Sequence, residues 1–293
     1  MINMDNIIAV IWKTVLLALA APLVSGVIRK IKNNLRMRKG PTIFQPYLDA
    51  RKLFLKDEVV SNNASWIFYA APVIVFASSV CALTMILAAG KAPLMNDGLA
   101  ILIAALFVLG LGRFFLALAG LDAGSSFGGM GSSREMFISS FAEPAAFIAV
   151  FVLCMGGGDG FRISNVLAGF ALSMVALAET SRIPVDNRET HLELTMVHEA
   201  MVLEYSGRSL ALIELASHIK QMAFFTLITF FFIAPAALCP AWPQFAVKIA
   251  VIALVFALVE ISVAKMRLFR VVDFLTFSFF VALIATIAAG LGL

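Results

Sequence analysis

Charge is scarce in this sequence. Only 14% of its 293 residues are charged, whereas 61% are hydrophobic, and the mean hydropathy is +0.98. An ordinary soluble domain has about 25% charged and about 45–50% apolar residues, so the composition indicates an integral membrane protein. The formal net charge is only +4, and membrane topology accounts for it without a nucleic-acid partner.

Cysteine is scarce as well. Cys81, Cys154 and Cys239 are far apart and lack the paired spacing that holds zinc or an iron–sulfur cluster. The glycine-rich stretch at residues 124–131 lacks the Gly-Lys-Ser/Thr ending of a phosphate-binding loop, and we expect a flexible turn with close backbone approach there. We therefore predict that this chain binds no metal centre and no cofactor of its own.

Long apolar runs, by contrast, are abundant. About 20 apolar residues in a helix cross the roughly 30 Å hydrocarbon core of a bilayer, and helices satisfy their own backbone hydrogen bonds in lipid. Segments of alternating polarity, typical of a membrane barrel, do not occur. We predict an all-α integral membrane protein, a single membrane domain over residues 1–293, that spans the bilayer about eight times. The predicted spans are residues 7–28, 66–89, 99–120, 135–155, 163–180, 209–238, 245–264 and 271–290.

The loops differ in their content of Lys and Arg, and short basic loops stay in the cytoplasm. The loop at residues 29–64 is strongly basic and the one after residue 264 is basic, whereas the loops on the opposite side contain almost no Lys or Arg. We predict that the loops at 29–64 and 181–208 face the cytoplasm and that both termini lie outside. Within the first loop, apolar residues at near-helical spacing from Tyr47 to Leu55 predict a short amphipathic helix in the cytoplasmic interface. This helix is either a surface anchor or one that borders a cavity or docks a partner.

Carboxylates occur inside the predicted spans, where an ionisable side chain costs about 2.5–3.5 kcal/mol. Those in the cytoplasmic halves of their spans are Glu143, Glu179, Glu214 and Glu260. Carboxylates gathered in a pocket of low dielectric constant raise one another's pKa and share protons, so we predict a proton pathway along these residues. The alternative is a set of separate ion pairs, such as Glu179 with Arg182. For Glu260 a structural role near the end of its span fits the pattern at least as well.

The loop at residues 181–208 concentrates charge of both signs and two of the three histidines. Pro184 ends the preceding span, and Asp186 is suited to cap a helix that begins near Arg188. The two histidines are seven residues apart, which does not match the His-Glu-x-x-His spacing of a zinc protease. We therefore predict a charged helical lid that faces the cytoplasm and forms an interface.

Two motifs carry a resemblance to a known family. Residues 178–186 read AETSRIPVD and are followed by Glu193-Leu194 and by Glu204-Tyr205-Ser206-Gly207, which resembles the subunit 1 family of respiratory complex I. The basic loop, with Gly40-Pro41, Gln45-Pro46 and Lys52-Leu53, resembles the second motif of that family. The stretch THLELTMVHEAM at residues 190–201 is similar to the branch found in membrane-bound [NiFe]-hydrogenases, which includes formate hydrogenlyase subunit 4 and the Ech-type hydrogenase membrane subunit.

The resemblance implies a membrane subunit of a group 4 [NiFe]-hydrogenase complex in a prokaryotic cytoplasmic membrane. Such a subunit docks the peripheral hydrogenase arm and couples electron transfer and H₂ chemistry to H⁺ or Na⁺ translocation. Its implied partners are the hydrogenase large and small subunits, iron–sulfur subunits and antiporter-like membrane subunits, and the [NiFe] centre and iron–sulfur clusters belong to these partners. Two alternatives are a quinone-site subunit of a NADH:quinone oxidoreductase and a passive structural anchor. The residues that the resemblance places at the arm interface and coupling loop are Arg182, Asp186, Glu193, His198, Glu199 and Glu204.

Overall fold

The computed structural model describes residues 4–60, 64–90, 97–155, 162–186, 197–232 and 241–292, and within these ranges the chain forms helices and turns but no strand. The predicted all-α fold is therefore confirmed. In chain order the helices are α1 (Met4–Leu35), α2 (Gln45–Phe54), α3 (Trp66–Ala89), α4 (Leu99–Asp122), α5 (Ser126–Met155), α6 (Ile163–Glu179), α7 (His198–Val202), α8 (Gly207–Phe232), α9 (Ala241–Ser262) and α10 (Leu268–Gly290).

The predicted spans coincide with helices. Among the described residues, seven helices are long and apolar enough to cross a membrane, namely α1, α3, α4, α5, α8, α9 and α10. Helix α6 is apolar but has only 17 residues, and it occupies the position of the remaining predicted span. The chain is therefore a multi-pass membrane protein.

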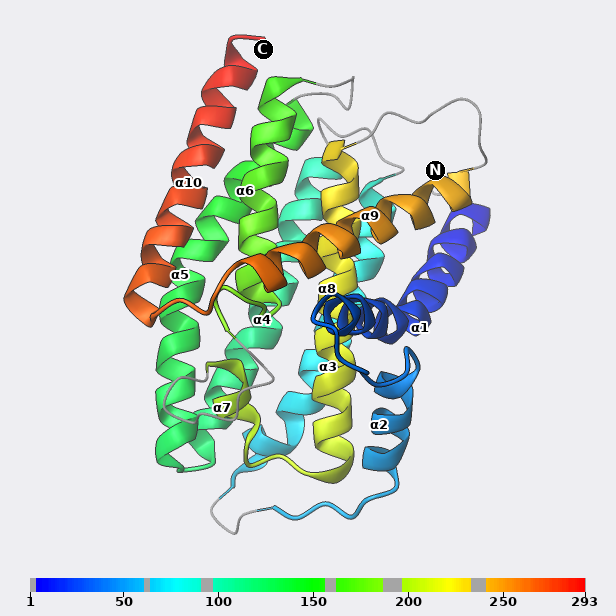
Figure 1. Cartoon of the computed structure of the whole chain (residues 1–293), viewed down its shortest axis with the longest axis vertical. Coiled ribbons are helices and arrows are strands. Elements are labelled where there is room, and N and C mark those ends of the chain that lie inside the picture. Colours follow the sequence, from blue (N-terminus) through cyan, green and yellow to red (C-terminus); the bar gives the residue numbers. More distant parts are fainter. Residues whose placement is uncertain are drawn as a thin grey trace.

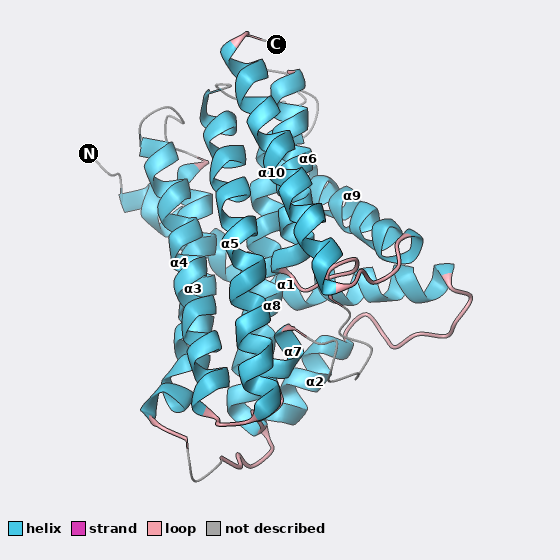
Figure 2. Ribbon diagram, turned by 90° about the vertical axis from the view of Figure 1, so that its left-hand side faces the viewer, coloured by secondary structure: helices cyan, strands magenta, loops and turns pink. Residues whose placement is uncertain are grey.

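Helices α3, α4, α5, α6 and α8 run side by side along the long axis of the molecule, whereas α1 and α9 cross this bundle obliquely (Figure 1). Turning the molecule by 90° shows the same bundle from the side, with the ends of α1 and α10 that carry the two termini toward one end and with α2 and α7 toward the other (Figure 2). The elements predicted to face the cytoplasm thus lie together.

Most of the glycine-rich stretch, residues 126–131, belongs to a helix instead of forming the predicted turn. Helix α5 begins at Ser126, nine residues before the predicted span. A Cβ added to Gly128 would lie 2.3 Å from the carbonyl oxygen of Gly120 on α4, so the glycine is needed where the two backbones meet. Close approach of small residues is what drives packing between helices in a membrane, because lipid offers no hydrophobic driving force.

The amphipathic helix of the first loop is present as α2. Its Pro46 and Ala50 are buried, and the helix packs against α8 and α1. The Tyr47 hydroxyl donates a hydrogen bond to the carbonyl oxygen of Leu19, in α1. Figure 1 shows α2 running alongside the lower part of α8. The protein therefore covers Pro46 and Ala50, whereas Leu48, Phe54 and Leu55 of the predicted apolar face are exposed.

Candidate functional site

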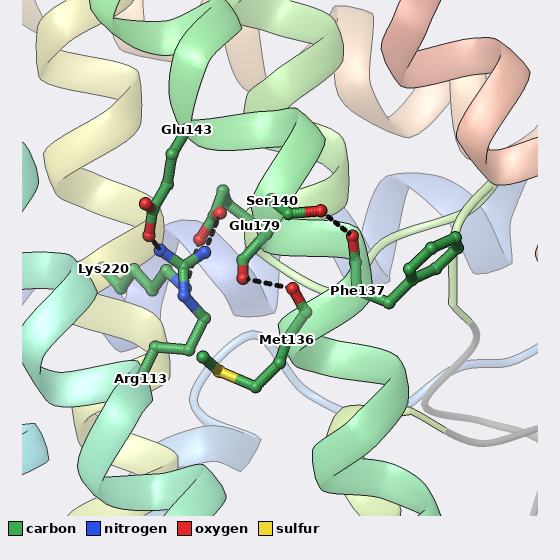
Figure 3. Close-up of polar contacts among 8 residues, drawn as sticks. Arg113, Met136, Phe137, Ser140, Glu143, Glu179 and Lys220 are labelled. Carbon is green, nitrogen blue, oxygen red and sulfur yellow. Dashed lines mark hydrogen bonds and ion pairs between the residues drawn. The ribbon is translucent and has the colours of Figure 1, made fainter.

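A buried arginine connects two of the predicted carboxylates. Arg113, on α4, is 8% exposed, and its guanidinium donates hydrogen bonds to Glu179 at the end of α6 and to Glu143 on α5. The ammonium of Lys220, on α8, lies 2.7 Å from the second oxygen of Glu179. Figure 3 shows the guanidinium between the two carboxylates with Lys220 beside it. We refer to Arg113, Glu143, Glu179 and Lys220 as the Arg113 cluster.

The sequence of α4 makes room for this cluster. A Cβ added to Gly110, one turn before Arg113, would lie 3.3 Å from the Glu143 carboxylate, so glycine lets that carboxylate rest against the α4 backbone. Burying an unpaired charge costs several kcal/mol, and here cations from two helices pair with carboxylates from two others. The side chains of Arg113 and Glu179 are each 6% exposed, whereas that of Glu143 is 43% exposed. Glu143 is thus the member of the cluster most open to its surroundings.

Two cavities flank the Arg113 cluster. The first is lined by Arg113 and Glu179 together with Glu135, His198 and Lys220, among others. The second is smaller and is lined by Arg113, Glu179 and Glu143 and otherwise by apolar residues of α4, α5, α6 and α8. Arg113 and Glu179 line both cavities, so they form part of the wall between them.

Glu260 belongs to a different group of buried charges. Its carboxylate lies 2.8 Å from the guanidinium of Arg182 and 3.2 Å from the ammonium of Lys32, and Glu260 is 2% exposed. The Gln221 side-chain oxygen accepts hydrogen bonds from Arg182 and from the Ser25 hydroxyl, both at 2.8 Å. We refer to Lys32, Arg182, Gln221 and Glu260 as the Glu260 cluster. Arg182 thus pairs with Glu260, and the partners of Glu179 are Arg113 and Lys220.

Asp186 joins the loop to two other segments. One of its carboxylate oxygens accepts hydrogen bonds from the backbone N–H groups of Val197 at 3.1 Å and His198 at 3.3 Å. The other oxygen accepts from the Lys265 ammonium at 2.8 Å. Asp186 therefore binds the first backbone N–H groups of α7 from eleven and twelve residues earlier in the chain, whereas the helix that it was predicted to cap lies outside the described residues. Its negative charge also suits the positive end of a helix.

The remaining predicted site residues are dispersed. Glu214 is on α8 and does not line either cavity. His198 lines the first cavity, whereas on the same short segment Glu199 is half-buried and Glu204 is exposed. Glu193 and the helix predicted near Arg188 lie outside the described residues. Within the described ranges, no group of three or more His, Cys, Asp or Glu side chains could hold a metal ion.

The comparisons with known proteins agree with this architecture. A family model described as NADH dehydrogenase matches residues 7–290. The chain belongs to the NADH dehydrogenase subunit 1 family. The resemblance carried by the two sequence motifs is therefore confirmed.

Relatives within the family include subunits of hydrogenase complexes. The chain is 33% identical over 242 residues to hydrogenase-4 component C of Escherichia coli (strain K12), covering 78% of this chain and 75% of that protein. It is 30% identical over 275 residues to formate hydrogenlyase subunit 4 of the same organism, covering 85% and 87%. NADH-ubiquinone oxidoreductase chain 1 of Metridium senile is 29% identical over 297 residues, covering 90% and 87%. One solved structure, of an archaeal membrane-bound sulfane sulfur reductase, shares the fold with a TM-score of 0.80 at 18% identity, covering 98% of this chain and 100% of that one.

Sequence reasoning missed several members of the two clusters. Lys32 lies within the predicted basic loop at residues 29–64, yet it is 5% exposed and pairs with Glu260. Gln221 carries no charge, so the cost of burying a charge in a membrane does not single it out as a site residue. Arg113 and Lys220 lie inside spans, and the cost of an ionisable group there was the signal that could have paired them with carboxylates. The partner of each could not be assigned without the helix packing.

Proposed function

We propose that this chain is the membrane subunit of a group 4 [NiFe]-hydrogenase complex, where it holds the peripheral hydrogenase arm and couples H₂ chemistry to ion translocation. The main support is the Arg113 cluster, which places paired charges inside the helical bundle within reach of the loop that carries Asp186 and α7. A subunit that served only as an anchor would gain nothing from charges at that depth. The identities to hydrogenase-4 component C and formate hydrogenlyase subunit 4 favour the hydrogenase branch.

The two clusters suit coupling because they are adjacent along α8. Lys220 of the Arg113 cluster precedes Gln221 of the Glu260 cluster directly. A displacement of this part of α8 therefore changes the distances in both. Moving one charge against 100 mV costs about 2.3 kcal/mol, and a change of about two units in the pKa of one carboxyl supplies about 2.7 kcal/mol. A rearrangement of ion pairs around one or two carboxylates is thus sufficient.

The proposal includes the surroundings of the chain. We place it in a prokaryotic cytoplasmic membrane, with both termini outside and with α2 and α7 on the cytoplasmic side. The partners would be the hydrogenase large and small subunits, iron–sulfur subunits and antiporter-like membrane subunits. Those partners would supply the [NiFe] centre and the clusters that carry out the electron transfer. The residues of this chain would bind the arm and take part in moving the translocated ion, H⁺ or Na⁺.

The test has two parts. Affinity purification of the tagged chain from its native membranes should bring down a complex that contains nickel, and inverted membrane vesicles should take up acid when that complex evolves H₂. In assembled complexes, Glu179→Gln should abolish acid uptake. The matched control, Asp97→Asn, changes an exposed residue that precedes α4 and should leave acid uptake intact. A nickel-free complex that reduces quinone would assign the chain to the quinone branch instead. Unchanged acid uptake in Glu179→Gln would leave only the anchoring role.

A further inference from the structure

Arg113 is the one cationic side chain among the described residues that lines both cavities, and Glu179 and Leu109 line both as well. Arg113 lines both cavities, and its two terminal nitrogens point to carboxylates on different sides, Glu179 and Glu143. The first cavity also holds Glu135, which is 8% exposed and lies on the same helix as Glu143 but two turns earlier. A proton on the Glu135 side therefore meets the guanidinium before it reaches Glu143.

The charges around this wall do not balance. Among the described residues that line the two cavities, three carboxylates, those of Glu135, Glu143 and Glu179, face two basic side chains, Arg113 and Lys220. An uncompensated negative charge is destabilising in a medium of low dielectric constant, so binding one proton stabilises the three carboxylates. Groups that interact this closely titrate together and share that proton.

Among the described residues, the other elements around the first cavity add one further titratable group. Helix α3 contributes the hydroxyls of Ser78 and Ser79, and α8 contributes Ser217 beside Lys220. The remaining titratable group is His198, at the start of α7. His198 lines the first cavity and its backbone N–H binds Asp186, so it is the group through which the loop can deliver or withhold a proton.

We propose that Arg113 is a gate between the two cavities and that H⁺ is the ion that crosses it. A proton arrives on Glu135, passes through Glu179, which lines both cavities, and ends on Glu143: one O–H bond breaks on the donor and one forms on the acceptor. Neutral Glu143 no longer attracts the guanidinium, which then pairs with Glu179 and the newly ionised Glu135. Glu143 releases its proton to the second cavity, becomes anionic and draws Arg113 back.

The same geometry disfavours Na⁺ at this step. A sodium ion needs several oxygen ligands, and three of the four carboxylate oxygens of Glu143 and Glu179 already bind nitrogen donors from Arg113 and Lys220. A proton needs only one oxygen lone pair and no cavity. This inference rests on the proposed function, which leaves H⁺ and Na⁺ open, and makes it specific.

The test measures passive proton flow, which requires no electron donor. The purified complex is reconstituted into liposomes, a potential is imposed with potassium and valinomycin, and acid entry is followed with a pH-sensitive acridine dye. Arg113→Gln should raise the proton flux per complex about tenfold or more over wild type, as a barrier lower by about 1.4 kcal/mol would. The matched control is Arg162→Gln, an exposed arginine at the far end of α6 from Glu179, which should not leak.

Further variants separate a gate from a structural role. Glu143→Gln should not leak, because the acceptor is missing, and Arg113→Gln combined with Glu143→Gln should not leak either. If Arg113→Gln does not assemble, Arg113→Lys decides, since a single ammonium cannot bridge both carboxylates and should give a smaller leak. An assembled Arg113→Gln or Arg113→Lys variant whose passive proton flux equals that of wild type overturns the gate. A proton flux in the Arg113→Gln, Glu143→Gln double variant as high as in Arg113→Gln alone overturns it as well.

The outcomes for the proposed function remain distinct. Wild-type complex that shows no ion uptake linked to H₂ evolution refutes the proposed function itself. Wild-type complex that takes up ²²Na⁺ instead of acid keeps that function but refutes H⁺ as the ion at the gate. If the wild-type complex takes up acid during H₂ evolution and the Arg113 variants show no raised passive proton flux, the gate is refuted and the proposed function stands.

Discussion

A proline inside α3 leaves a buried carbonyl without its helical donor, and Tyr205 supplies a replacement. Pro72 has no N–H, so the carbonyl of Phe68, four residues earlier, cannot make the usual helical hydrogen bond. The Tyr205 hydroxyl donates to that carbonyl at 3.0 Å, and its ring stacks on Phe68 with centroids 4.1 Å apart. Both residues are buried. Tyr205→Phe keeps the stacking and removes only the donor.

The magnitude follows from what the substitution leaves behind. A buried acceptor without a partner costs about 1–3 kcal/mol, so we expect Tyr205→Phe to destabilise the chain by that amount. In a Pro72→Ala background the new N–H can bond to the Phe68 carbonyl. The same substitution should then cost only about 0.5 kcal/mol, the lower end for an ordinary hydrogen bond.

The effect should not depend on pH over the usual range. Burial, with the negative charges of Asp122 and Glu58, raises the pKa of Tyr205 above its ordinary value of about 10. A group whose pKa is raised by folding contributes its full stability below the unfolded pKa and loses it as the pH rises through the folded pKa. Tyr205 therefore remains protonated, and remains a donor, from pH 6 to pH 9.

The measurement is a double-mutant cycle on the purified complex. Unfolding temperatures of wild type, the two single variants and the double variant are compared at pH 6 and pH 9, with a shift of about 2–4 °C expected for each kcal/mol. The cycle should show a coupling of about 0.5–2.5 kcal/mol. An equal cost of Tyr205→Phe in both backgrounds would refute the role assigned to the orphaned carbonyl.

Three further predictions use other contacts. Asp186→Asn removes the charge that holds the start of α7, so the amides there should exchange with deuterium about 10–100-fold faster, for a loss of about 1.5–3 kcal/mol; unchanged exchange would exclude the cap. Lys32→Met should lower the unfolding temperature, and the loss of unfolding free energy should be smaller than the roughly 3–5 kcal/mol of a fully broken buried pair, because Glu260 keeps Arg182. Adding Glu260→Gln should not restore the unfolding temperature, since Arg182 then loses its carboxylate partner. Gly128→Ala forces a Cβ to 2.3 Å from a backbone oxygen and should cost about 1–3 kcal/mol, whereas Gly129→Ala, whose Cβ would meet only a flexible leucine at 3.8 Å, should be nearly neutral.

The fold could be predicted from the sequence to a large extent, because lipid imposes long apolar helices. Helix α3 (Trp66–Ala89) coincides with its predicted span, and the others differ mainly at their ends. The sequence does not predict the early start of α5, because the six glycines and serines among its first eight residues are typical of a turn. Their helical state depends on a close contact with α4, and a contact between two helices leaves no periodic signal in either sequence.

The candidate site was predictable only in part. The cost of charge in a membrane was enough to single out Glu143, Glu179 and Glu260, but not to say which cation binds each. Glu179 and Glu260 were expected in one pocket, and they lie in different clusters because Arg182 turns toward α9 and Arg113 approaches from α4. These partners are separated by 66 and 78 residues, and only the packing of the helices decides such pairs.

The segment that follows α6 explains how one short stretch can reach both clusters. Glu179, Arg182 and Asp186 are spaced three and four residues apart, so in a continuous helix they would share one face. The helix ends at Glu179, and Ser181 has a φ of 51°, in the left-handed region. The three side chains therefore diverge: the first reaches α4 and α8, the second α8 and α9, and the third the start of α7. A force on α7 is thus transmitted through Asp186 to a segment of eight residues that holds both Glu179 and Arg182, so neither cluster can keep its distances if that segment moves.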